Sequence, residues 1–128
     1  DHSGHELSLR SPPAPVEVRA PRLMVELALR NLIDNAVRHT PVGSQVVVQV
    51  WHDAQGAALA VSDDGQRPGG APAPAHQGLG LGLRLVERMA DDMGAALVRD
   101  AGEPPMTTRF LLRWPTVRPA PNGPPTDA

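Results

Sequence analysis

The N-terminal part of the chain alternates hydrophobic with polar residues. Residues 5–10 and residues 16–19 both show this period of two. Because successive side chains of a strand point to opposite faces, the pattern predicts two short strands. The prolines of residues 11–15 predict a turn between them.

Two later segments carry a helical period. Over residues 22–39, apolar side chains recur every three or four positions, which predicts an amphipathic helix. A second segment with this spacing follows residue 82 and ends at Gly94, a residue suited to a helix C-terminal cap. The two apolar stripes consist of Val25, Leu29, Leu32 and Ala36, and of Leu83, Val86, Ala90 and Met93.

Four further strands complete the predicted elements. Residues 45–51 and 57–62 are rich in apolar residues and are joined by the turn residues of 52–56, so we predict a hairpin. Residues 95–100 and 107–114 predict two more strands. Helices and strands mix without regular βαβ alternation. This order indicates an α+β fold, with helices over one face of a mixed, mainly antiparallel sheet.

Proline and glycine interrupt two stretches of the chain. Residues 63–77 contain both repeatedly and predict a long loop of functional length. Residues 116–128 are rich in proline and short of core residues. We therefore expect one domain over residues 1–115 and a disordered proline-rich tail over residues 116–128.

The composition argues against several kinds of partner and site. The 128 residues include 12 basic and 14 acidic side chains, for a formal net charge of -2, and no cysteine. Without a block of like charges we expect no nucleic-acid partner. The lack of cysteine excludes disulfides and thiolate metal sites. No run of eighteen apolar residues occurs, so we expect no direct membrane contact by this piece of chain.

Polar side chains share one face of the first predicted helix. Asn31, Asn35 and Arg38 are spaced four and three residues apart, which places two carboxamides and a cation on one patch. An amide oxygen is a hard ligand suited to Mg2+, and arginine pairs with phosphate. The alternative is an ordinary solvated face of the helix.

Two glycine-containing segments also suggest chemistry. Asp63 follows a predicted strand and Gly65 comes just after it, so a carboxylate can accept a hydrogen bond from an exocyclic amine while a flat ring approaches the backbone. The run GLGLGL at residues 78–83 matches neither G-x-G-x-x-G nor the P-loop. Glycines that enter a helix nevertheless present N–H groups to phosphate. An ordinary turn at Asp63 and a tight packing turn at residues 78–83 are the alternatives.

Taken in order, these segments resemble the catalytic ATP-binding domain of sensor histidine kinases, in the superfamily of gyrase, the ninety-kilodalton heat-shock chaperone and MutL. NLIDNAVRHTP resembles the N box, VSDDG the first glycine box, GLGLGL the second, and TTRFLLRWP the closing strand. The resemblance covers residues 5–115. It implies the two-layer Bergerat fold and the binding of ATP and Mg2+.

The resemblance implies a role for each matched residue. Asn35 is expected to coordinate Mg2+, Asn31 to support the metal or its waters, and Arg38 to contact phosphate. Asp63 is expected to bind the adenine amino group. The other residues expected to line the nucleotide or to shape the phosphate-facing turn are His39, Gly65, Gly78, Leu79, Gly80, Leu81, Gly82, Leu83 and Thr108.

The chain departs from the family pattern beside the nucleotide. Arg67 stands where the first glycine box usually has its second glycine, so it either alters the turn or reaches the phosphates. Leu79 stands where the family commonly has serine or threonine, which removes one hydroxyl donor. The segment corresponding to the ATP lid is short and proline-rich, and it lacks the aromatic motif of the family.

Asn31 distinguishes between branches of the superfamily. The ATP-hydrolysing members and the serine-kinase anti-sigma factors carry glutamate at this position, where it can act as a general base. An amide cannot take that proton at neutral pH. Asn31 therefore favours a domain that holds ATP while a histidine elsewhere supplies the nucleophile, with transfer driven by positioning and charge neutralisation.

One histidine resembles a different motif of the family. GHELSLRSP is similar to the phosphoacceptor box, but only 26 positions separate His5 from Asn31, too few for the long helical hairpin that lies between the two boxes in a full kinase. We interpret this segment as an edge strand. We accordingly expect the chain to bind ATP without phosphorylating itself alone.

The leading hypothesis is a Mg-ATP-binding domain whose γ-phosphate passes to a histidine on a separate dimerisation domain, and from there to a response regulator. The resemblance implies a cytoplasmic domain of an inner-membrane sensor, monomeric when isolated and homodimeric in the parent kinase. The alternative is a degenerate nucleotide-binding or interaction module of the same fold without kinase activity. An ATP-hydrolysing relative is more remote.

Overall fold

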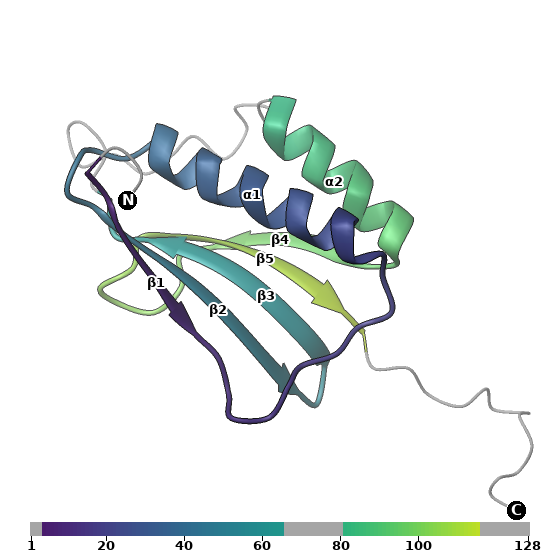
Figure 1. The fold of residues 1–128 in the computed structure, drawn as a ribbon. Coiled ribbons are helices and arrows are strands. Elements are labelled where there is room, and N and C mark those ends of the chain that lie inside the picture. The colour runs from purple at the N-terminus through teal and green to yellow at the C-terminus, as the bar shows by residue number, and fades with distance from the viewer. Residues whose placement is uncertain (1–3, 66–80, 116–128) are drawn as a thin grey trace, which may run out of the picture.

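The computed structural model describes residues 4–65 and 81–115 as two helices packed on a five-stranded sheet (Figure 1). Both helices lie on the same face of the sheet, in two layers, as the α+β prediction requires. The elements in chain order are β1 (Glu6–Arg10), α1 (Arg22–Arg38), β2 (Gln45–Asp53), β3 (Gly56–Asp63), α2 (Leu81–Met93), β4 (Ala96–Asp100) and β5 (Thr108–Trp114).

The sheet is mixed and mainly antiparallel, as predicted. The strand order is β1-β2-β3-β5-β4, so β1 and β4 form the two edges. Only the β1–β2 pair is parallel, and the other three pairs are antiparallel. The predicted hairpin is β2–β3, and the predicted edge strand around His5 is β1.

The hydrophobic core lies between the helices and one face of the sheet. Alternate residues of the strands face the helices, and Val46 and Leu112 are 0% and 0% exposed there. The helices contribute Leu32 and Val86, which are 1% and 0% exposed. Burial of such side chains, worth about 1.5–3 kcal/mol each, holds the two layers together.

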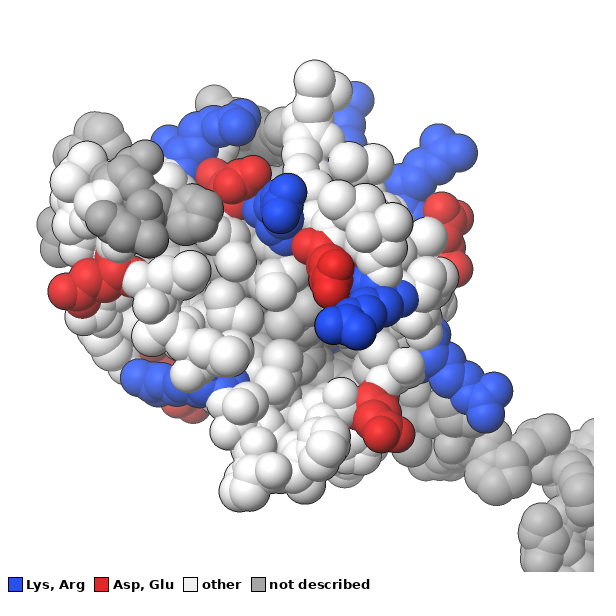
Figure 2. All heavy atoms as spheres, in the orientation of Figure 1, with Lys and Arg blue, Asp and Glu red and all other residues white. Residues whose placement is uncertain are grey.

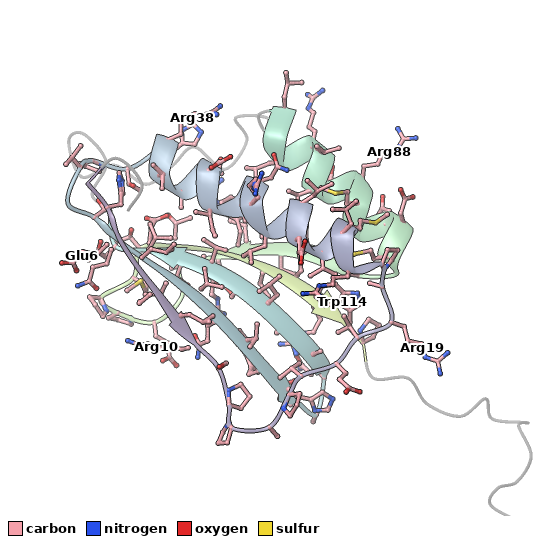
Figure 3. The ribbon with its side chains drawn as sticks, viewed as in Figure 1. Glu6, Arg10, Arg19, Arg38, Arg88 and Trp114 are labelled. Carbon is pink, nitrogen blue, oxygen red and sulfur yellow. The ribbon has the colours of Figure 1, made fainter. Side chains whose placement is uncertain are left out.

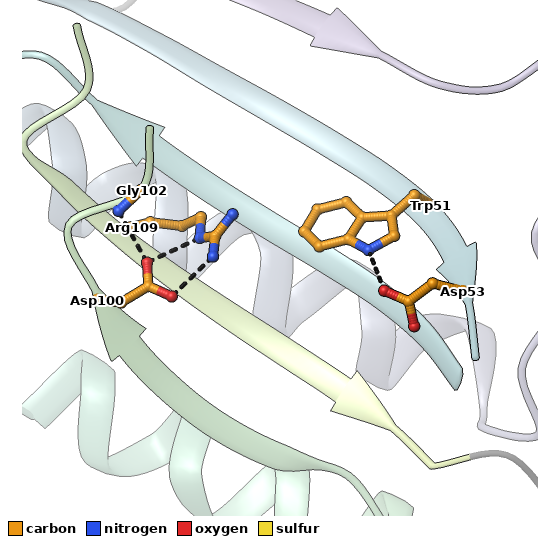
Figure 4. A network of polar contacts seen from close by, with 5 residues as sticks. All are labelled: Trp51, Asp53, Asp100, Gly102 and Arg109. Carbon is orange, nitrogen blue, oxygen red and sulfur yellow. Dashed lines mark hydrogen bonds and ion pairs between the residues drawn. The ribbon is translucent and has the colours of Figure 1, made fainter. Parts of the chain in front are cut away.

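The open face of the sheet is covered by its own side chains. The ring of Trp51 lies under the guanidinium groups of Arg109 and Arg113, at 5.7 and 5.9 Å from centroid to Cζ. Arg109 is held by both carboxylate oxygens of Asp100, at 2.8 and 2.7 Å, and the indole N–H of Trp51 donates to Asp53 at 2.9 Å (Figure 4). Beneath this layer a second small cluster is buried, consisting of Ala58, Ala60 and Leu111.

One predicted strand is wrong. Residues 16–19 are not paired with any strand in the described part of the chain. Val16 and Val18 are half-buried against the main core, while Glu17 and Arg19 are exposed. The alternation therefore arises because an extended segment lies along the core, and such packing produces a period of two without a hydrogen-bonded ladder.

Charges of opposite sign are interspersed over the helical face (Figure 2). Arginine side chains alternate there with aspartate and glutamate, and no large area of one sign appears in this view. Among the described residues, neither helix combines the length and the apolar character needed to span a lipid bilayer.

Candidate nucleotide-binding site

The three polar residues of the predicted patch lie on the C-terminal half of α1. Asn31 and Asn35 are half-buried and Arg38 is exposed in the last turn. Figure 3 shows Arg38 at this end of the helix, whereas Arg19 and Trp114 lie at the opposite end of the domain. A cation in the last turn also interacts favourably with the helix dipole.

The side-chain amide of Asn31 has a fixed orientation. Its Nδ2 donates to the carbonyl oxygen of Leu27 at 2.8 Å, one turn earlier on α1. Its Oδ1 faces the first turn of α2, because a Cβ atom added to Gly82 would lie 3.4 Å from that oxygen. The last three residues of GLGLGL thus form the start of α2, and the amide oxygen of Asn31 lies between α1 and this turn.

Asp63, the residue expected to bind the adenine amino group, is the last residue of β3. It is 5% exposed, and its Oδ1 accepts the backbone N–H of Gly65 at 3.1 Å. The neighbouring carboxylate, Asp64, has a different role, since its Oδ1 accepts the N–H of Gln45 at 2.7 Å and so holds the start of β2. Of the two adjacent aspartates, Asp63 is therefore the one that faces the interior.

The first residue of β5 and the residue just before it bring two threonines to Asp63. Thr108 is its direct partner in the β3–β5 register and is 6% exposed. Thr107, which the sequence did not single out, donates its backbone N–H to the carbonyl of Asp63 at 2.8 Å, and its hydroxyl lies 2.8 Å from the carbonyl oxygen of Gly65. The Thr-Thr pair in the sequence was the available signal, but only the register distinguishes the two residues.

Gly65 packs against the segment that follows α1. A Cβ atom at this position would lie 2.6 Å from Cβ of Thr40, closer than real Cβ atoms approach, and 3.2 Å from Oγ of Ser44, which is a tight contact. The absence of a side chain is therefore required by close packing. Thr40 and Ser44 are two further residues of this region that sequence reasoning missed.

The remaining predicted residues are distributed as follows. His39 is the C-terminal cap of α1, where its backbone N–H donates to the carbonyl of Asn35, and its side chain is exposed. Leu81 is 86% exposed, whereas Leu83 is 7% exposed and belongs to the main core. Four predicted residues lie outside the described part of the chain: Arg67, Gly78, Leu79 and Gly80.

His5 is unsuited to be a phosphoacceptor. Its side chain is 5% exposed, and its Nε2 lies 2.9 Å from the hydroxyl of Thr40. A phosphoacceptor imidazole has to reach a phosphoryl donor, and this one is enclosed at the start of an edge strand. The interpretation of the segment as a strand is confirmed.

The donor set fits a cation held partly by phosphate. Within residues 4–65 and 81–115, no group of three or more histidine, aspartate or glutamate side chains converges as a metal site. The amide oxygens of the α1 patch are hard ligands, and Mg2+ typically takes one or two protein ligands together with phosphate oxygens and waters. Such a site matches a metal that arrives with a nucleotide.

Comparison with known proteins identifies the family. Residues 21–118 match the model of the histidine kinase-, DNA gyrase B-, and HSP90-like ATPases. The sensor protein IrlS of Burkholderia pseudomallei is 33% identical over 117 residues, covering 77% of this chain and 24% of IrlS. The chain thus spans about a quarter of the length of this curated relative.

Solved structures of sensor kinases share the fold. The mycobacterial sensor histidine kinase MprB superposes with a TM-score of 0.68 at 26% identity, over 89% of this chain and 85% of that one. The ATP-binding domain of PrrB from Mycobacterium tuberculosis gives a TM-score of 0.65 at 27% identity, over 88% and 82%. The chain belongs to the histidine kinase-, DNA gyrase B-, and HSP90-like ATPase family, as a catalytic domain of the sensor histidine kinase type.

Proposed function

We propose that this domain binds Mg-ATP and supplies the γ-phosphate to a histidine on a separate dimerisation and phosphoacceptor domain. The observation that carries the proposal is the arrangement of two amides and a cation on α1, with Oδ1 of Asn31 facing Gly82. The buried Asp63 at the end of β3 is connected to this helix through Gly65, which packs against Thr40 just after α1. One group of residues suits phosphate and metal, and the other suits an adenine ring.

At the adenine end, the Asp63 carboxylate is the proposed acceptor for the exocyclic amine. The N–H of Gly65 donates to its Oδ1, which holds the carboxylate in place before a ligand arrives. Thr108 lies opposite Asp63 on β5, so the proposed adenine contact stands at the paired ends of two neighbouring strands. A preorganised carboxylate loses little freedom on binding, which favours affinity.

At the phosphate end, Asn35 is the proposed Mg2+ ligand and Arg38 the proposed phosphate contact. The metal would neutralise charge on the phosphates as the γ-phosphoryl group is transferred. Asn31 cannot remove a proton from water, and its amide is already committed as a donor to Leu27. The chain's own contribution is therefore positioning and electrostatic stabilisation, and the nucleophile comes from the partner domain.

An exposed apolar pair next to this end suits the partner. Leu81 and Leu85 are 86% and 50% exposed and lie one turn apart on α2. We propose that they contact the phosphoacceptor domain, which then passes the phosphoryl group to a response regulator. We further propose a cytoplasmic location, by analogy with the cytoplasmic segment of the histidine kinase QseC, and a parent protein that is a membrane sensor.

The degenerate-module alternative receives less support. A domain that had lost nucleotide binding would not need to retain both α1 amides, the buried Asp63 and the glycine beside it. The departures that motivated it, Arg67, Leu79 and the short proline-rich lid segment, lie outside the described residues.

Titration with ADP and with a non-hydrolysable ATP analogue, with and without Mg2+, tests the proposal. Nucleotide at about 100 times its Kd should stabilise the fold by about 2.7 kcal/mol, which appears as a raised Tm. An unchanged Tm and no binding at millimolar nucleotide would rule out the function. Binding that is indifferent to Mg2+ would rule out the metal.

A further inference from the structure

A buried histidine outside the N box and the two glycine boxes lies next to the adenine end of the proposed site. His5 is 5% exposed and immediately precedes β1. The following residue, Glu6, donates its backbone N–H to the carbonyl of Ser44 at 3.1 Å, which fixes the start of β1 against the segment after α1. The imidazole Nε2 is 2.9 Å from Oγ1 of Thr40.

The direction of this hydrogen bond follows from the other bond of Thr40. The threonine hydroxyl donates to the carbonyl of Ala36 at 2.7 Å, and a hydroxyl has a single proton. When both bonds are present, the oxygen of Thr40 must accept from His5. The imidazole therefore carries a proton on Nε2, and the side chain of Thr40 is held from two sides.

Held in this way, Thr40 presents its Cβ and methyl group to Gly65. A side chain at Gly65 would overlap these atoms, since its Cβ would lie 2.6 Å from Cβ of Thr40. The backbone of Gly65 is thus confined between Thr40 and the hydroxyl of Thr107, which lies 2.8 Å from the Gly65 carbonyl oxygen. The N–H of the same glycine donates to Oδ1 of Asp63 at 3.1 Å.

We propose that His5 is a positioning residue for adenine recognition, acting through Thr40 and Gly65 on the Asp63 carboxylate. The inference rests on the proposed nucleotide function. His5 itself does not contact the nucleotide in this proposal. It contacts Thr40, which packs against Gly65, and Gly65 in turn holds the Asp63 carboxylate. Its consequence is that loss of the His5 donor reduces affinity for the adenine base, while binding of the phosphates is retained.

The test compares ADP with IDP, which has a carbonyl in place of the exocyclic amine. Calorimetric titrations of the 128-residue chain would measure both Kd values for the wild type, His5→Phe and His5→Gln. In His5→Phe the Kd for ADP should rise about fivefold, as expected for loss of one buried hydrogen bond, and the Kd for IDP should change little. His5→Gln retains an N–H donor of similar reach and should restore most of the preference for ADP.

Two further variants keep the result decisive. Thr40→Val keeps the shape of the side chain but removes the hydroxyl, and should reduce the ADP preference as His5→Phe does, even if His5→Phe folds poorly. His52→Phe changes an exposed histidine on β2 and should leave both Kd values unchanged. Equal losses for ADP and IDP, or an unchanged ratio in His5→Phe and Thr40→Val, would overturn the positioning role. If the wild type binds neither nucleotide, the proposed function itself fails.

Discussion

Oδ1 of Asn31 on α1 lies against Gly82 in the first turn of α2, where an added Cβ would be 3.4 Å from the oxygen. A methyl group at this distance makes ordinary van der Waals contact, whereas a branched side chain extends over the amide oxygen. We predict that Gly82→Ala retains nucleotide binding and that Gly82→Val weakens it by about tenfold or more. Kd values measured for the ATP analogue with Mg2+ check this.

The paired variants also separate obstruction from misfolding. Alanine is a better helix former than glycine, and Gly82 is in the first turn of α2, so Gly82→Ala should have a Tm equal to or slightly above that of the wild type. Unchanged or tighter nucleotide binding by Gly82→Val would show that the space next to Oδ1 of Asn31 is not part of the site.

Gly65→Ala should destabilise the fold. The new Cβ overlaps Thr40, and overpacking of this kind costs about 1–3 kcal/mol. Denaturant unfolding measures the loss, and Thr40→Ser, which removes the nearby methyl group and keeps the hydroxyl, should recover part of it in the double variant. Independent, additive effects of Gly65→Ala and Thr40→Ser would contradict the packing between these residues.

Acid should destabilise the fold by protonating two carboxylates on the open face of the sheet, Asp100 and Asp53. The Arg109 guanidinium that hydrogen-bonds to Asp100 lowers the pKa of this carboxyl, and the N–H of Gln55 together with Trp51 lowers the pKa of Asp53. A carboxyl with a depressed folded-state pKa stabilises the fold above its unfolded pKa of about 4, and this stability is lost as the pH falls through the lower folded value. The free energy of unfolding should therefore decline as the pH falls below about 4.

Replacing one of these carboxyl groups measures how much it contributes to the pH dependence of the unfolding free energy. In Asp100→Asn the decline in unfolding free energy below pH of about 4 should be shallower than in the wild type. Asp34→Asn, at an exposed position on α1, serves as the matched control. An identical pH profile for wild type and Asp100→Asn would contradict the contribution of the Arg109 pair shown in Figure 4.

Local sequence signals were sufficient for most of the fold. The spacing of Val25, Leu29 and Leu32 predicted α1, and the turn between residues 51 and 57 predicted the β2–β3 hairpin, because both depend on neighbours in the chain. Residues 16–19 were predicted wrongly, since alternation reports burial on one side and not the presence of a partner strand.

Contacts between distant segments could not be read from the sequence. His5 and Thr40 are 35 residues apart, and Thr107 is 44 residues from Asp63. No periodicity encodes such pairs. They follow from the parallel β1–β2 register and from the placement of β5 beside β3. The resemblance identified site residues that lie in contiguous motifs. It did not identify the residues that hold them in place, because those contacts join distant segments of the chain.

The central claim, a Mg-ATP site built on α1, is tested most directly by Asn35→Ala in a thermodynamic cycle with Mg2+. Kd values for the ATP analogue would be measured for the wild type, Asn35→Ala and the neighbouring control Asp34→Ala, each with and without Mg2+. We predict that Asn35→Ala loses most of the gain in affinity that Mg2+ gives the wild type and binds metal-free nucleotide almost as well, while Asp34→Ala retains the gain. An equal loss of affinity with and without Mg2+ in Asn35→Ala would contradict the claim.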